Sequence, residues 1–243
     1  MTTVTRDSIS LRGSGVVSIK QPASGVRFTL DSLLLADFCR IKPRDVVLEP
    51  GTGTGIVSLL LAKKFPAITL VSIEARGHAT ALCRENISDN GLDGRILLLR
   101  QDIRKMKHAM KPASFDAIIA NPPYTRNGTG RPSPDRERLT SRHDRLGTIQ
   151  SWLDLGVLLK DKGRYFLVLP ANRSAEILSL LHSAYLEPKR VRFVHPYQNR
   201  PANLILIEAM KSAGSGLEVM PPLAVHEEGG GYTAEMRQIY DLS

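Results

Sequence analysis

Short apolar runs alternate with amphipathic stretches from Asp45 to the end of the chain, and this alternation predicts most of the fold. Uninterrupted runs rich in Val, Ile and Leu are typical of buried strands, whereas apolar residues at helical spacing are typical of helices. We expect strands at 45–51, 68–75, 95–102, 115–123, 164–170, 190–196 and 202–210. We expect helices at 55–65, 77–91, 148–163 and 174–186.

The order of these elements predicts an α/β fold with one mostly parallel sheet. Strands that alternate with helices form parallel pairs, and the helices then cover both faces of the sheet. Only the segment "YQNRP" separates the last two of the seven strands. A link this short permits only a hairpin, so the last strand should run antiparallel to its neighbour.

The length of 243 residues and a hydrophobic content of 42% suit one large α/β domain or one domain with a smaller appendage. We place the main domain at 45–243 and an N-terminal extension, which contributes to the cofactor and substrate site, at 1–44. The first 15 residues lack the apolar core of a signal peptide and resemble a transit peptide only faintly. No apolar run is long enough for a transmembrane helix. We therefore expect a cytoplasmic protein without a membrane partner.

The net charge of +9 gathers in three segments. Residues 1–44 carry seven Lys/Arg against three Asp/Glu, the insert at 126–145 carries six arginines against three acids, and 100–111 carries five basic residues and one acid. Such clustering favours a polyanionic partner over a merely solvated surface. Charge alone does not distinguish RNA from DNA or from an anionic membrane.

The cysteines and two large aromatic residues are expected to belong to the core. Cys39 and Cys83 have no second Cys or His at metal-ligand spacing, so we expect two buried thiols and no metal site. Trp152 falls on the apolar face of a predicted helix, and Tyr185 is interpreted in the same way.

A glycine-rich loop, "LEPGTGTGIV", joins the first strand of the main domain to its first helix. Gly51, Gly53 and Gly55 allow a tight turn and a close approach to a ligand. A phosphate-binding loop would need Lys and Ser or Thr where Ile56 and Val57 stand, and the spacing fits a dinucleotide-binding fingerprint poorly. A plain tight turn remains the alternative. The spacing after an acidic residue resembles the S-adenosylmethionine (AdoMet) loop of class I methyltransferases.

Acidic residues follow at the ends of successive strands. Glu49 precedes the glycines, Glu74 ends the second strand and Asp102 ends the third. Ligands of open α/β sheets bind at the carboxyl ends of the strands, where a carboxylate can accept both hydroxyls of a ribose. Each acid taken alone could be a helix cap or a surface charge.

The fourth strand ends in Asn121-Pro122-Pro123-Tyr124. The amide oxygen of Asn121 and the carbonyl of Pro122 can accept both N–H bonds of a planar amine and so orient its lone pair. The two prolines stiffen this stretch, and Tyr124 offers a face on which a base can stack. The alternative is a proline-rich loop after a strand. The motif resembles that of the amino-methyltransferases, which act on adenine in DNA or RNA or on a glutamine amide.

Further segments resemble the bacterial tRNA1(Val) adenine-N6 methyltransferase family over nearly the whole chain. They are "FTLDSLLLADF", "RPSPDRERLTSRHD", "EPKRVRFVHPYQNRPANLILIEA" and "YTAEMRQIY". At "FTLDS", where family members more often carry Gly-Thr-Asp-Ala, Thr29 and Asp31 do not align cleanly. The resemblance implies a class I, Rossmann-like methyltransferase that uses AdoMet to methylate the N6 amine of an adenine in structured RNA, most simply tRNA near the anticodon.

The expected site residues combine the motifs with this resemblance. Cofactor binding is expected at Glu49, Gly51, Gly53, Gly55, Glu74, Asp102, Ile103 and Asn121. Catalysis is expected at Asn121, Pro122, Pro123 and Tyr124. Substrate binding is expected at Tyr124, Arg126, Arg131, Arg136, Arg138, Arg142 and His143, although His143 could equally pack the insert.

Three alternatives stay open on the sequence. A DNA adenine methyltransferase would favour a separate sequence-reading domain, for which little chain is left. A protein glutamine methyltransferase would not call for three basic segments. A non-catalytic RNA-binding module with a vestigial cofactor site is a different class of protein, against which the intact motifs argue.

Overall fold

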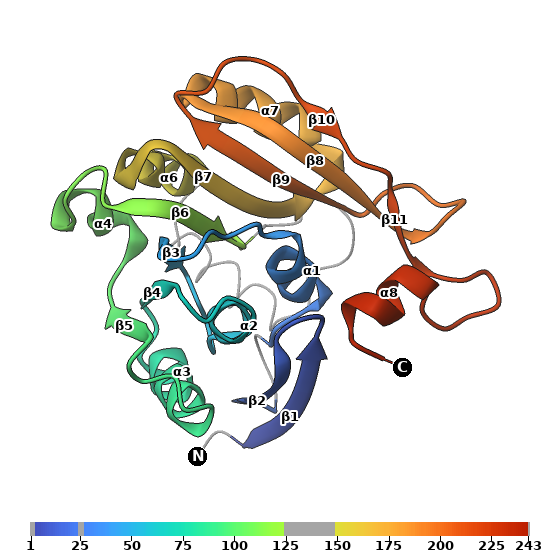
Figure 1. Ribbon diagram of the computed structural model, residues 1–243, viewed down its shortest axis with the longest axis horizontal. Coiled ribbons are helices and arrows are strands. Elements are labelled where there is room, and N and C mark those ends of the chain that lie inside the picture. The colour runs from blue at the N-terminus through green and yellow to red at the C-terminus, as the bar shows by residue number, and fades with distance from the viewer. Residues whose placement is uncertain (1–2, 24–26, 124–148, 243) are drawn as a thin grey trace, which may run out of the picture.

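The computed structural model describes residues 3–23, 27–123 and 149–242, and its centre is a sheet covered by helices on both faces (Figure 1). The strand order is β10-β8-β9-β7-β6-β3-β4-β5, with β11 also paired to β8. The strands are β3 (Val46–Pro50), β4 (Thr69–Glu74), β5 (Ile96–Arg100), β6 (Phe115–Ala120), β7 (Leu159–Pro170), β8 (Leu186–Tyr197), β9 (Leu204–Lys211), β10 (Glu218–Val219) and β11 (Leu223–His226). The helices are α1 (Leu30–Phe38), α2 (Ile56–Lys64), α3 (Gly77–Asp89), α4 (Ile103–Ala109), α6 (Ile149–Leu153), α7 (Ser174–Ser183) and α8 (Ala234–Ile239).

The sheet is mostly parallel, as the alternation of strands and helices predicts. Strands β5, β4, β3, β6 and β7 pair in parallel, and β9 runs antiparallel to both β7 and β8. The short link before β9 therefore makes the expected hairpin. Two short strands, β10 and β11, extend the sheet beyond the seven expected strands by pairing parallel to β8.

Two helices are shorter than expected. The predicted helix at 148–163 ends at Leu153, continues as a 3₁₀ turn at Asp154–Leu158 and gives way to β7 at Leu159. Leu158 and Leu159 fit a helical period, but Leu159 pairs with Phe115 of β6, and this tertiary pairing overrides the local pattern.

The helix expected at 174–186 ends at Ser183, and the placement of Tyr185 in the core is wrong. The backbone of Tyr185 turns through a φ of 58°, and Leu186 then begins β8. The tyrosine side chain is 81% exposed. Trp152, by contrast, is buried as expected.

The helices divide between the two faces of the sheet (Figure 1). One core joins residues of α1, α2 and α3, and residues of α8 complete it. A second core joins residues of α4, α6 and α7 to the opposite face. Both faces are thus covered, which leaves the carboxyl ends of the parallel strands as the place for a ligand.

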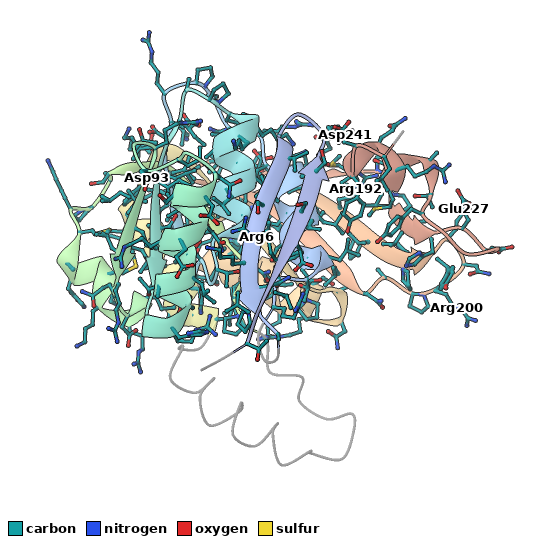
Figure 2. The ribbon with its side chains drawn as sticks, turned by 90° about the horizontal axis from the view of Figure 1, so that it is seen from below. Arg6, Asp93, Arg192, Arg200, Glu227 and Asp241 are labelled. Atoms are coloured by element: carbon teal, nitrogen blue, oxygen red, sulfur yellow. The ribbon has the colours of Figure 1, made fainter. Side chains whose placement is uncertain are left out.

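An N-terminal hairpin, β1 (Val4–Leu11) and β2 (Gly15–Pro22), packs against α2 and α3. Asn86 of α3 and Asn90, the C-cap one turn later, bind the edge of β2 with their side-chain amides. Asn86 accepts from the N–H of Lys20 at 2.7 Å and donates to its carbonyl at 2.9 Å, and Asn90 does the same at Ser18. Arg6, labelled on β1 in Figure 2, pairs with Asp89 of α3 at 2.9 Å. Hydrogen bonds and an ion pair therefore hold the hairpin against α3.

Within the described ranges, no helix combines the length and apolarity needed to cross a membrane. In the same part of the chain, no group of three or more His, Cys, Asp or Glu could hold a metal ion. Cys39 and Cys83 are free and buried, and burial raises the pKa of each thiol above its ordinary value.

Candidate active site

The glycine loop turns tightly between β3 and α2. Gly51, Gly53 and Gly55 have φ values of 68°, 61° and 95°, all in the left-handed region that favours glycine. A Cβ on Gly55 would lie only 2.8 Å from Sγ of Cys83, so α3 approaches the loop closely there. Asn86 reaches the same loop, because its amide donates to the carbonyl of Thr54 at 2.9 Å. One asparagine thus connects the N-terminal hairpin with the glycine loop.

Gly51 faces the indole ring of Trp152. A Cβ at Gly51 would lie 2.6 Å from Cη2 of the ring, closer than a carbon contact allows. Trp152 is 2% exposed, and its Nε1 has no hydrogen-bond partner among the residues that the structure describes. Helix α6 on the second face of the sheet therefore contacts the start of the loop through Trp152.

Glu49 is buried beneath the loop rather than open to its surface. It is 5% exposed, and its carboxylate accepts a hydrogen bond from Thr52 Oγ1 at 2.7 Å and a short one from Ser58 Oγ. Burial raises the pKa of Glu49 to about 7, and the hydroxyl donors only partly offset this effect. The carboxyl group therefore changes charge near neutral pH.

We expect stability to depend on the titration of Glu49. Its pKa rises from 4.5 to about 7 on folding, so between these values the folded state binds more protons than the unfolded state. The free energy of unfolding contributed by this group is then greatest below pH 4.5, falls as the pH rises through the window, and is lowest above pH 7. Urea unfolding of the wild type and Glu49→Gln across this window should show a flatter pH profile for the variant. Identical profiles would contradict the assignment.

Glu74 is fully hydrogen-bonded at the end of β4. Oε1 accepts the backbone N–H of Arg76 at 2.9 Å and its Nε at 2.8 Å, while Oε2 accepts the N–H of Gly53 at 2.9 Å and Nη2 of Arg76 at 3.2 Å. The carboxylate is 2% exposed. It thus joins the glycine loop to β4 and holds an arginine at the position expected for a ribose.

Asp102 caps α4, and Ile103 is buried beside it. The Asp102 carboxylate accepts the N–H of Arg104 at 2.9 Å and is chelated by the Arg104 guanidinium at 2.5–3.1 Å. These bonds hold the pKa of Asp102 below its ordinary value. Asp102 is thus a helix cap, and its carboxylate lies near the same edge of the sheet as Glu74.

Asn121 lies at the end of β6 and contacts the N-terminal segment. Its Nδ2 donates to Ser32 Oγ of α1 at 3.1 Å, across 89 residues of sequence. Ser32 is 7% exposed, Pro122 is buried, and Asn121 and Pro123 are partly buried. In this arrangement the amide nitrogen of Asn121 points toward α1.

The remaining substrate-binding predictions lie outside the described residues. They are Tyr124, Arg126, Arg131, Arg136, Arg138, Arg142 and His143. Sequence reasoning missed Ser32, Arg76 and Trp152 as neighbours of the site. The signal for Ser32 was its place in "FTLDS", whereas Arg76 follows a candidate ribose acid by two positions.

The comparisons with known proteins bear on this strand-end site. A family model described as the methyltransferase small domain matches residues 11–134, half of the chain. The chain belongs to this family. The matched segment contains the glycine loop, Glu74, Asp102 and the Asn-Pro-Pro-Tyr motif, and the expectation of a methyltransferase is confirmed.

Curated relatives agree with the resemblance found in the sequence. The chain is 29% identical over 192 residues to a tRNA1(Val) (adenine(37)-N6)-methyltransferase of Vibrio vulnificus, covering 79% of this chain and 78% of the relative. It is 30% identical over 178 residues to the enzyme of the same name from Bacteroides fragilis, covering 73% and 74%. The fold is similar to that of a predicted O-methyltransferase from Agrobacterium tumefaciens, with a TM-score of 0.70, 19% identity and coverage of 87% and 96%.

Proposed function

We propose that this chain transfers the methyl group of AdoMet to the N6 amine of an adenine in tRNA, in the anticodon region. The observation that supports this proposal most directly is Asn121, held at the strand edge that also carries the glycine loop and Glu74. The names of the curated relatives support the same acceptor. An anticodon-loop base is already partly exposed, which lowers the cost of moving it into a site.

The residues present fit AdoMet. A Cβ on Gly53 would meet only Nη2 of Arg76 at 3.9 Å, so the loop backbone can approach a ligand there, whereas Gly51 and Gly55 make room for Trp152 and Cys83. Glu74 can accept ribose hydroxyls once the guanidinium of Arg76 moves away, and Asp102 can accept from an adenine amine. AdoMet supplies an electrophilic methyl group with a good leaving group.

Asn121 and Pro122 would orient the acceptor amine. The lone pair of an exocyclic amine is delocalised into its ring, so the amine must be turned before it can attack. The oxygen of Asn121 and the carbonyl of Pro122 accept its two N–H bonds, and Ser32 keeps the amide nitrogen turned away from the amine. Because the prolines restrict this stretch, the acceptors are preorganised. No strong general base is needed.

The proposal is tested by radiolabelled methyl transfer from AdoMet to total tRNA, total DNA and a release factor in parallel, with nucleoside analysis of the products. We expect label in tRNA as N6-methyladenosine. Label in DNA or in a glutamine side chain would show that the acceptor is DNA or protein instead of tRNA. AdoMet binding without any methyl transfer would favour a non-catalytic module.

Glu74→Gln should weaken AdoMet binding without unfolding the protein. Hydrogen bonds to a charged group contribute about 1.5–3 kcal/mol, which corresponds to a loss of roughly ten- to a hundredfold in affinity. Calorimetry measures the effect. The matched control is Glu85→Gln on α3. It removes the exposed carboxylate that pairs with Lys20, and it should leave AdoMet affinity unchanged. An unchanged affinity in Glu74→Gln would mean that Glu74 only fastens the loop.

We further propose that the N-terminal segment contributes to the site through Ser32. Ser32→Ala removes the acceptor that orients Asn121, and the loss of a hydrogen bond worth about 0.5–1.5 kcal/mol should lower kcat roughly two- to tenfold. KM and AdoMet affinity should stay unchanged, and Ser32→Thr should restore kcat because it keeps the hydroxyl. A change in KM with constant kcat would assign Ser32 to substrate binding instead.

A further inference from the structure

The starting observation is the hydrogen bonding of Glu74, which has no acceptor capacity left. An ionised carboxylate offers about four lone-pair sites. Two are taken by backbone N–H groups of Gly53 and Arg76, and two by the guanidinium of Arg76. The backbone donors belong to the fold. A ribose that donates two hydroxyls to Glu74 can therefore be accepted only if the guanidinium leaves.

Once displaced from Glu74, the side chain of Arg76 would lie near a second arginine, Arg100. Arg100 ends β5, and the strand register sets its Cα opposite that of Glu74. The guanidinium of Arg100 lies where a side chain on Gly77 would be, with Cζ and Nη2 each 3.1 Å from the position of the absent Cβ. Gly77 adjoins Arg76 in the chain. Both arginines are exposed, so two cationic groups would face solvent at the same place.

We propose that Arg76 and Arg100 bind a backbone phosphate of the RNA substrate once AdoMet has displaced Arg76 from Glu74. Two guanidinium groups side by side match the oxygens of a phosphate, which they bind better than a single charge does. While Arg76 is paired with Glu74 its charge is neutralised, and of these two arginines Arg100 is the one available to a phosphate. Cofactor binding thus adds one cation to the RNA-binding surface. This inference rests on the proposed function, because it needs AdoMet at Glu74 and RNA as substrate.

The consequence is a measurable coupling between the two ligands. Each additional phosphate contact steepens the dependence of log K on log salt by roughly 0.7–0.9. One additional contact of this kind corresponds to about fivefold tighter RNA binding at physiological salt than the protein has without it. Linkage requires that RNA tighten cofactor binding by the same factor.

The experiment measures binding of a labelled, unmodified tRNA1(Val) transcript over a range of salt, with and without saturating S-adenosylhomocysteine, which cannot donate a methyl group. In the wild type we expect the slope to steepen by roughly 0.7–0.9 when the cofactor product is added. Arg76→Ala should abolish this increment. Arg100→Ala should reduce the slope in both states, because Arg100 is available in both. Arg84→Ala, an exposed arginine further along α3, is the control and should keep the increment.

Arg76→Lys guards against a folding artefact. Lysine keeps the charge but cannot chelate both oxygens of Glu74, so it should show the steep slope even without the cofactor product. Equal slopes with and without S-adenosylhomocysteine in the wild type would overturn the proposal, as would an increment that survives in Arg76→Ala. Calorimetry distinguishes failure of the proposed function from failure of this inference. If S-adenosylhomocysteine does not bind at all, the proposed function itself fails. If it binds without changing the salt slope, only the role of Arg76 is refuted.

Discussion

Asn121→Ala should lose methyl transfer while keeping AdoMet binding. Orientation of the acceptor amine matters most at the transition state, so the loss should appear in kcat. Removal of one preorganised polar contact of this kind lowers the rate on the order of 10²–10³-fold, by analogy with oxyanion-hole deletions. Single-turnover transfer to tRNA and calorimetry with S-adenosylhomocysteine measure the two quantities separately.

Two further variants sharpen this test. Asn121→Asp keeps one acceptor oxygen but cannot donate to Ser32 and adds a charge, so it should also be slow. Asn199→Ala removes an exposed asparagine that binds Glu228 at 3.1 Å, and it should turn over normally. If Asn121→Ala methylates tRNA at the wild-type rate, the motif is only a proline-rich turn and the adenine-N6 mechanism built on it is wrong.

Gly51→Ala should destabilise the protein strongly and far more than Gly53→Ala in the same loop. A left-handed backbone costs an alanine about 1–2 kcal/mol, and the new Cβ would lie 2.6 Å from the ring of Trp152. Overpacking a close-packed core adds about 1–3 kcal/mol. The sum predicts a loss of roughly 2–5 kcal/mol in the free energy of unfolding, measured by denaturant titration.

Gly53→Ala is the matched control for this effect. Its φ of 61° resembles the 68° of Gly51, but the nearest atom to a Cβ there is Nη2 of Arg76 at 3.9 Å. Only the backbone strain of about 1–2 kcal/mol should remain. Equal losses in the two variants would show that Trp152 yields to the new methyl group without cost.

The sequence was most informative where one local rule decides the outcome. Apolar runs bounded by turns located the main strands, and the short link before Leu204 required β9 to be antiparallel. The rule failed at 148–163, where Leu159 has both helical spacing and a partner strand. It also missed the hairpin Val4–Pro22, whose strands carry many polar residues, although the turn "RGSG" was a usable signal.

The residues of the candidate site were likewise only partly predictable from the sequence. The glycines and the acids could be predicted because strand ends of a parallel sheet meet at one edge. The partners of these residues could not, since Ser32 meets Asn121 across 89 residues and Trp152 reaches Gly51 from the opposite half of the chain. The hydrogen bonds of Glu49 with Thr52 and Ser58 could not be predicted either, because Ser58 comes from the following helix, α2.

The position of β9 has a consequence for synthesis on the ribosome. β9 lies between β7 and β8 although it follows both in the chain, so β7 emerges before the strand that covers its edge. At roughly 5–20 residues per second, the nascent chain carries this open edge for a time on the order of seconds. An unpaired apolar edge recruits strands from other chains. Any product that stops before Leu204 should therefore aggregate rather than persist as an inactive monomer, so residues 204–243 keep the rest of the chain soluble.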